Sequence, residues 1–100
     1  MITKKYSPKG KSCRVTFTLP IEVAEDKVAV LGDFNNWDPE ALMLKVKGKR
    51  NPVWTGTISL KPGNTYQFRY LADGERWFND DTCDSYVPNE YGGYNCVIEV

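Results

Sequence analysis

The sequence predicts an all-β fold, an antiparallel β-sandwich of immunoglobulin-like architecture with about seven to eight short strands. Several segments alternate apolar and polar residues with period two, turn residues separate them at close spacing, and no helix longer than one turn is visible. One hundred residues suffice for one compact core but not for two. We expect one domain over residues 12–100, preceded by a flexible basic leader over residues 1–11, where lysines are mixed with serine, proline and glycine.

The first expected strands lie in the amino-terminal half. Residues 13–19 alternate strictly, with Val15 and Phe17 on the apolar face, which predicts a half-buried strand that Pro20 ends. Residues 27–31 are short, apolar and β-branched, as in a buried strand. Residues 42–46 form a further brief strand after a polar loop.

The remaining expected strands are separated by strong turn signals. Trp54 shares a face with Ile58 and Leu60 in a strand over residues 53–60, and this phase places Trp54 in the core. The sequence 61–64, with proline before glycine, predicts a type II turn that sends residues 65–72 back antiparallel. Asp73-Gly74 predicts a type I′ hairpin to residues 75–78. A loop over residues 79–93 then leads to a closing strand over residues 94–100.

Composition argues against several classes of partner. The 13 lysines and arginines balance 13 aspartates and glutamates, so net charge gives no reason to expect a wide basic face for nucleic acid. The amino terminus lacks the apolar stretch of a secretory signal, and no apolar run approaches the roughly 20 residues of a membrane span. We expect a cytoplasmic protein that binds neither nucleic acid nor membrane.

The three cysteines indicate neither a disulfide framework nor a metal site. Cys13, Cys83 and Cys96 are odd in number and have no CxxC spacing, and there is no histidine to complete a zinc site. Cys13 and Cys96 would approach each other if they lay on neighbouring strands. We expect reduced thiols and no cofactor.

Catalysis has little support in the sequence. Without histidine, Ser-His-Asp and Cys-His arrangements are impossible. A paired-carboxylate hydrolase or a calcium site remains conceivable around Asp80, Asp81, Asp84 and Glu90. Aspartates in such a run more often form turns with their own backbone. We expect a protein that is not an enzyme.

Two tryptophans stand in polar surroundings. Trp37 lies in a loop rich in asparagine and aspartate, and Trp77 follows a tight turn beside charged residues. A sugar ring stacks its C–H face on an aromatic ring, and its hydroxyls need amide or charged partners. The two indoles therefore favour a sugar-stacking platform, although either could instead fold back over the edge of the sandwich.

Three segments together resemble carbohydrate-binding module family 48, the isoamylase amino-terminal type of early-set domain. This family includes the glycogen-binding domain of AMP-activated protein kinase beta subunits. The similarity covers about residues 13–100. It is carried by residues 30–37 (VLGDFNNW), by residues 66–70 (YQFRY) with Asp73-Gly74 and Trp77, and by residues 95–100 (NCVIEV).

The resemblance implies binding of an α-1,4-linked glucan such as glycogen or starch on an exposed face. Trp37 and Trp77 would stack on glucose units, while Arg69 and Asn95 match positions that hydrogen-bond sugar hydroxyls. Tyr91 replaces an aliphatic wedge and would substitute for it by stacking.

Other departures from the family pattern are Gly93, which replaces a hydroxyl-bearing residue, and a hairpin lengthened by one residue at Glu75-Arg76. The resemblance also implies an association with glycogen-metabolising enzymes, such as branching or debranching enzymes, here in trans. The alternative function is a protein-interaction module in which the tryptophans are hot spots for a partner.

Overall fold

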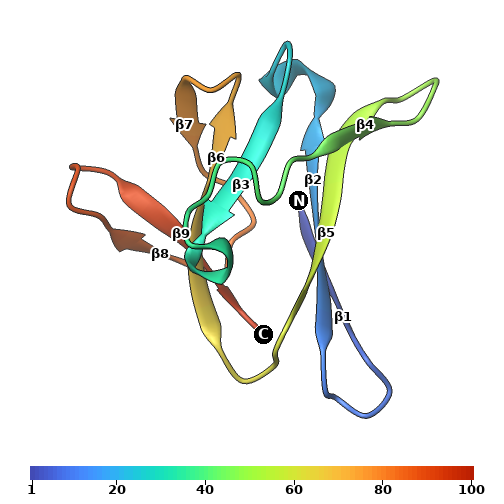
Figure 1. The fold of residues 1–100 in the computed structure, drawn as a ribbon, viewed down its shortest axis with the longest axis vertical. Helices are drawn as coiled ribbons and strands as arrows, with labels where there is room; N and C mark the ends of the chain where they lie inside the picture. Colours follow the sequence, from blue (N-terminus) through green and yellow to red (C-terminus); the bar gives the residue numbers. More distant parts are fainter.

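The computed structural model describes residues 1–100 and contains two antiparallel sheets, called sheet A and sheet B (Figure 1). Sheet A has the order β1 (Ile2–Tyr6), β2 (Cys13–Pro20), β5 (Val53–Leu60) and β4 (Lys45–Lys47). Sheet B has the order β3 (Val28–Gly32), β6 (Thr65–Ala72), β9 (Tyr94–Glu99) and β8 (Ser85–Pro88), with β7 (Arg76–Phe78) paired to β6. The helical elements are two 3-10 turns, η1 (Ile21–Val23) and η2 (Asp33–Asn35), and no helix is long and apolar enough to cross a membrane. The predicted all-β sandwich is confirmed.

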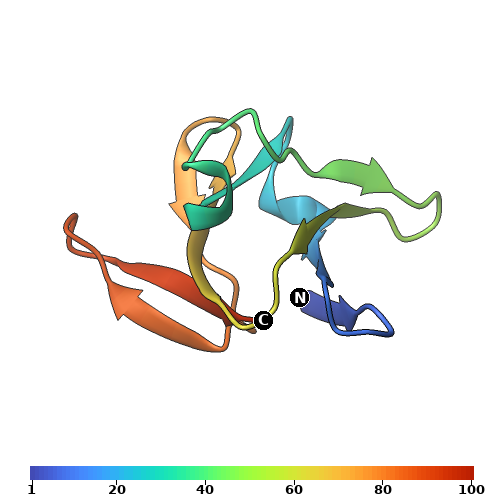
Figure 2. The ribbon, with the colours of Figure 1, turned by 60° about the horizontal axis from the view of Figure 1, so that its bottom comes forward.

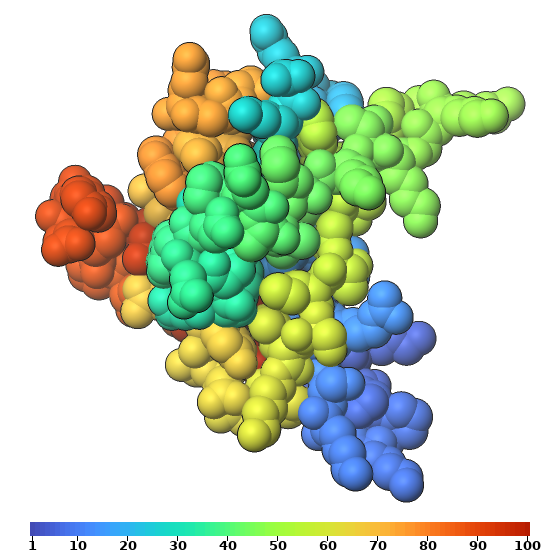
Figure 3. All heavy atoms as spheres, viewed as in Figure 1, coloured from blue at the N-terminus to red at the C-terminus, as the bar shows by residue number.

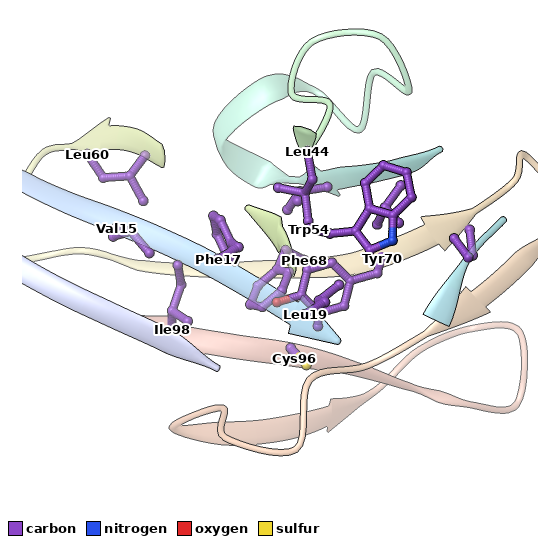
Figure 4. Packing of buried hydrophobic residues seen from close by; sticks show 14 of the residues in the cluster. Val15, Phe17, Leu19, Leu44, Trp54, Leu60, Phe68, Tyr70, Cys96 and Ile98 are labelled. Carbon is purple, nitrogen blue, oxygen red and sulfur yellow. The ribbon is translucent and has the colours of Figure 1, made fainter. Parts of the chain in front are cut away.

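The core lies between the two sheets and consists of the inward residues of each alternating strand (Figure 4). Phe17 of β2 packs against Phe68 and Tyr70 of β6, with ring centroids 5.2 and 6.1 Å apart in edge-on geometry. Trp54 is 6% exposed, and its indole N–H donates to the Ile21 carbonyl at 3.2 Å. The prediction that Trp54 belongs to the core is therefore confirmed.

The predicted flexible leader is wrong for residues 2–6, because these residues form strand β1. Antiparallel pairing aligns Ile2 with Phe17 and Tyr6 with Cys13 of β2. Lys4 also forms a salt bridge at 2.6 Å with Asp84 of the opposite sheet. The segment lacks a long apolar alternation, and its structure depends on hydrogen bonds to β2 that local sequence does not reveal.

The structure differs from three further expectations about the strands. The segment 79–93 is not a continuous loop, since β8 lies within it and pairs with β9; Figure 2 shows this hairpin extending away from the rest of the molecule. The turn at residues 61–64 has a positive φ of 87° at Gly63, as a type II turn requires, but β5 and β6 do not pair. This connection crosses from sheet A to sheet B. The brief strand expected at residues 42–46 is β4, shifted to Lys45–Lys47, with an isolated bridge at Met43.

The prediction of three reduced thiols is also wrong. Cys83 and Cys96 form a disulfide with a Cα–Cα distance of 5.8 Å, while Cys13 is buried and unpaired. Cys13 lies on β2 in sheet A and Cys96 on β9 in sheet B, so they are not on neighbouring strands. Cys83 approaches Cys96 because it comes just before β8, the strand that pairs with β9.

The predicted type I′ turn at Asp73-Gly74 is confirmed, with φ values of 54° and 70°. The Asp73 carboxylate accepts hydrogen bonds from the backbone N–H groups of Glu25, Asp26 and Lys27 at 2.7 to 3.1 Å. These bonds, from Glu25 first, hold the pKa of Asp73 well below its ordinary value. Asp73 thereby fastens the loop before β3 to the hairpin that carries Trp77.

Candidate functional site

All five residues predicted for the site line one groove on the outer face of sheet B. These residues are Trp37, Arg69, Trp77, Tyr91 and Asn95. Five more residues complete the lining: Asp33, Gln67, Pro88, Asn89 and Glu90. Figure 3 shows the two segments that flank the groove, the loop of residues 33–38 and the β8–β9 hairpin. The structure therefore brings together side chains from four separate parts of the sequence.

Trp37 is positioned by an unusual backbone. Asn36 and Trp37 both have a φ of 56°, in the left-handed region that non-glycine residues rarely adopt. Each such residue costs on the order of 1 to 3 kcal/mol. The Trp37 N–H donates to the Gly32 carbonyl at 3.0 Å, and its indole N–H donates to the Asp33 carboxylate at 3.2 Å. These bonds hold the half-buried indole at the edge of the groove.

The loop that presents Trp37 is anchored to β3. The Asn35 amide accepts from the Gly32 N–H at 3.0 Å and donates to the Val30 carbonyl at 2.9 Å. Gly32 itself lies so close to β6 that an added Cβ would be 2.6 Å from the Gln67 carbonyl oxygen. Only glycine fits there, because the neighbouring atoms are backbone in a paired strand.

Trp77 and Arg69 form a second pair on neighbouring strands. Trp77 is 47% exposed on β7, where it opposes Leu71 of β6. The Arg69 guanidinium carbon lies 5.8 Å from the centroid of the Trp77 ring, within the range of a cation–π contact. Arg69 Nε donates to the Asn79 side chain at 3.0 Å, and Asn79 donates to the Tyr94 carbonyl at 2.8 Å. These hydrogen bonds therefore hold the Arg69 side chain beside the Trp77 indole.

A chain of amides forms the floor of the groove. Asn95 of β9 donates to the Gln67 side-chain oxygen at 3.1 Å and accepts from the Asn89 amide at 3.2 Å. The Asn89 oxygen in turn accepts from the backbone N–H groups of Tyr91 and Gly93, both at 3.0 Å. Each amide is oriented by its neighbour, which leaves planar donors and acceptors at fixed positions.

Tyr91 lies at the tip of the β8–β9 hairpin and is the most exposed large apolar side chain, with 88% of its surface open. No hydrogen bond to its hydroxyl is formed, and only its backbone N–H is held, by Asn89. Its ring is thus placed at the rim of the groove on an extended hairpin.

Of the four carboxylates considered for catalysis or calcium, Asp80 and Asp84 form structural contacts. Asp80 is 2% exposed and accepts from the Tyr70 hydroxyl and the Thr82 hydroxyl, each at 2.6 Å. Burial raises the pKa of Asp80, but hydrogen bonds from Thr82 and Tyr70 outweigh it and lower the pKa overall. Burial also raises the pKa of the Tyr70 hydroxyl. No group of three or more histidine, cysteine, aspartate or glutamate side chains is placed to hold a metal ion.

Sequence reasoning missed several residues that line the groove or orient its side chains. Gln67 shares a face with Arg69 by strand alternation, which was a usable signal. Asn79 and Asn89 lay in the segment interpreted as a loop, so nothing indicated that they orient Arg69 and Asn95. Asp33 was unrecognised because its partner, the indole of Trp37, depends on a left-handed backbone.

The groove combines two indoles, one guanidinium and a set of oriented amides. Aromatic faces suit the C–H patches of a sugar ring, and planar amide and guanidinium groups suit pairs of neighbouring hydroxyls. An open groove with these groups is fitted to bind a polyhydroxylated chain.

Comparison with known proteins agrees with this geometry. Among curated proteins, none matches the sequence. A family model described as the glycogen recognition site of AMP-activated protein kinase matches residues 15–100. The match covers every groove residue and confirms the resemblance to a glycogen-binding module. The chain belongs to the family of the glycogen recognition site of AMP-activated protein kinase.

Proposed function

We propose that the protein is a non-catalytic module that binds α-1,4-linked glucan in the groove of sheet B. The observation that carries this proposal is the convergence of Trp37, Trp77, Arg69 and Asn95 on one surface. An α-1,4-glucan is curved and presents successive rings at different angles. Two indoles on separate elements, one at the η2 loop and one on β7, suit two such rings.

Each group has a distinct role in the proposal. The indoles stack on glucose units, and each stack contributes on the order of 1 to 3 kcal/mol, the scale of ring stacking on aromatics. Arg69 and Asn95 hydrogen-bond equatorial hydroxyls, since Asn79 and Gln67 already fix their orientation. Tyr91 covers a ring from the rim of the groove.

The decisive experiment is calorimetric titration of maltoheptaose into the parent protein, Trp37→Ala and Trp77→Ala. We expect each variant to bind about 5- to 150-fold more weakly, with little change in Tm. Tyr6→Ala is the matched control, because Tyr6 is an aromatic residue of similar exposure, 49%, on sheet A.

Two results would contradict the proposal. If both tryptophan variants bind maltoheptaose as tightly as the parent, the groove is not the glucan site. Tryptophan variants that keep glucan binding but lose a protein partner would instead support the alternative, a protein-interaction module with the indoles as hot spots.

We also propose that no glucan is cleaved. The groove has two carboxylates, and Asp33 is engaged by the Trp37 indole and the Gln67 N–H, which leaves Glu90 without the second free carboxylate that a glycosidase pair needs. Outside the groove, Asp80 and Asp84 form structural contacts. Prolonged incubation with maltoheptaose should give no shorter products by chromatography. Appearance of maltose or glucose that is lost in Asp33→Asn would overturn this.

A further inference from the structure

The neutral net charge conceals an uneven distribution of charge between the two sheets. Residues 1–20 and 41–61 contain all four strands of sheet A and ten of the 13 lysines and arginines, but no aspartate or glutamate. All 13 acidic residues lie in the segments that form sheet B and its loops. In Figure 3 the first segments, blue and green to yellow-green, lie mainly on the right, and the orange and red segments lie on the left. The molecule therefore has one basic half.

The basic half presents a regular outer face, here called the threonine face. The Cα register aligns its residues in three rows across the strands: Lys5, Arg14 and Ser59; Thr3, Thr16 and Thr57; and Thr18, Thr55 and Lys45. The hydroxyls of Thr16 and Thr57 are 2.9 Å apart. Every group in these three rows is a cation or a hydroxyl, and the next row on the same side, Pro20, Val53 and Lys47, adds one more cation and two small apolar residues.

The cations of the threonine face have no acidic partner. Of the ten basic residues in the two segments, only Lys4 forms a salt bridge, and Lys4 does not belong to this face. Lys5 lies directly opposite Arg14, an arrangement of like charges that destabilises a sheet. Lysine on edge strands prevents edge-to-edge pairing, which explains the lysines on the edge strands β1 and β4. It does not account for Arg14, which lies on the interior strand β2.

The chemistry of the threonine face limits the kinds of ligand that it can bind. Its three rows carry no aromatic side chain for stacking nucleic acid bases and no large apolar anchor for a protein hot spot, and the neighbouring Pro20 and Val53 are too few for the apolar face of a membrane-binding surface. Paired cations beside hydroxyl donors match the oxygens of a phosphate ester. A glucan chain held in the groove also keeps further parts of the same branched polymer at high local concentration, so weak charge contacts suffice.

We propose that the threonine face binds phosphate esters carried by the glucan, with Lys5, Arg14 and Lys45 as the charged contacts. This inference rests on the proposed function, because the groove tethers the polymer. The two outer faces point away from the core in opposite directions, so they engage different chains of one branched particle.

The test compares phosphate-bearing amylopectin with the same amylopectin after phosphatase treatment. At low salt the parent should bind the phosphorylated polymer roughly tenfold more tightly, a scale set by a few exposed ion pairs. Added salt should remove this preference, because exposed charges are screened. The triple variant Lys5→Gln, Arg14→Gln, Lys45→Gln should lose the preference and keep its affinity for maltoheptaose, whereas Arg14→Lys should keep both. Should the triple variant unfold, the single variants Lys5→Gln and Lys45→Gln should each reduce the preference.

The outcomes separate the two proposals. A parent protein that binds maltoheptaose but shows no preference for phosphate, or a preference that the glutamines leave intact, would overturn the inference alone. Failure to bind maltoheptaose at all would refute the proposed function. Tighter binding of single-stranded RNA, polyglutamate or phosphatidylserine vesicles than of phosphorylated amylopectin, abolished in the triple variant, would assign the face to another occupant.

Discussion

The two outer faces of the sandwich are built on the same strand alternation but carry different chemistry. On sheet B, side chains such as Gln67 and Asn95 hydrogen-bond one another and share a groove with the indoles of Trp37 and Trp77. On sheet A, the three rows of the threonine face carry threonines, a serine and cations, which are placed by regular strand pairing. The inward residues of both sheets are equally apolar, so the core does not explain the difference.

The groove requires irregular structure, whereas the threonine face does not. The groove depends on a left-handed loop, a type I′ hairpin and the β8–β9 hairpin, each fixed by specific side-chain bonds. The threonine face needs only regular pairing. Substitutions should therefore perturb the groove more than the threonine face.

Gly32→Ala should have the largest effect. The new Cβ would lie 2.6 Å from the Gln67 carbonyl oxygen and 2.7 Å from the Phe68 Cβ, so β3 must move away from β6. We expect a loss of about 3 kcal/mol in the free energy of unfolding, the upper part of the range for overpacking, together with loss of glucan binding. Urea denaturation measures the first quantity.

Gly93→Ala is the control for that experiment, because its Cβ would meet only the Asn89 side chain at 3.6 Å, an ordinary contact. A stability of Gly32→Ala equal to that of Gly93→Ala would show that the close packing beneath the groove is not required.

Gln67→Ala should have the next largest effect, on binding rather than on folding. It removes the acceptor that orients the Asn95 amide, while the backbone N–H of residue 67 still donates to Asp33. We expect maltoheptaose affinity to fall by about 1 kcal/mol, near the net contribution of one hydrogen bond. Gln67→Glu keeps an acceptor for Asn95 and should lose less; an equal loss in both variants would refute the orienting role.

Acid should weaken the groove side selectively, since the segments of sheet A contain no carboxylate side chain. Hydrogen bonds from Glu25, Lys27 and Asp26 depress the pKa of Asp73 below its ordinary value of 3.8. As the pH falls, Asp73 therefore takes up a proton in the unfolded chain before it does so in the folded protein. The contribution of Asp73 to stability is full above its ordinary pKa and is lost as the pH falls through the pKa of the folded state.

Comparing Asp73→Asn with the parent tests this pH dependence. Asparagine also tolerates the left-handed turn, so the substitution removes the carboxylate without straining the backbone. The parent should therefore have the higher Tm at neutral pH, and the difference in Tm should shrink in strong acid, where the carboxylate is protonated. A Tm difference that is the same at both pH values would contradict the role of the carboxylate.

Thr57→Val should have the smallest effect. Thr57 is exposed on the threonine face, valine keeps the β-branched shape, and only the bond to the Thr16 hydroxyl is lost. We expect a change in unfolding free energy within about 0.5 kcal/mol and unaltered maltoheptaose affinity. If Thr57→Val lowers maltoheptaose affinity as much as Gln67→Ala does, the two faces are not independent.

Regular strands could be predicted from the sequence where alternation was strong. The bounds of β5 and β6 coincide with the predicted segments, since both carry long period-two patterns. Strands β1 and β8 were missed because their apolar patterns are short and β8 ends in proline, so pairing rather than local sequence decides their conformation. The crossover from β5 to β6 was missed because a turn type does not specify the sheet that the next strand joins.

Only part of the site could be predicted, because only some of its residues have a signal in the local sequence. Trp37 and Trp77 stood out as aromatic residues in polar surroundings, whereas the family resemblance, rather than local physics, singled out Arg69, Asn95 and Tyr91. Supporting residues such as Asn79 and Asn89 carry no local signal, because their role depends on partners that the fold brings close.

The crossed topology of sheet B has a consequence for how the molecule folds. Strand β6 pairs with β3, well before it in the sequence, and with β9, well after it, so loops of many residues must close before these contacts form. Proteins dominated by such distant pairings reach the native state on the order of milliseconds to seconds. Since Gln67, Arg69 and Asn95 come from β6 and β9, a partly folded chain has no ligand site, and binding competence arises in the same slow step as the native sheet.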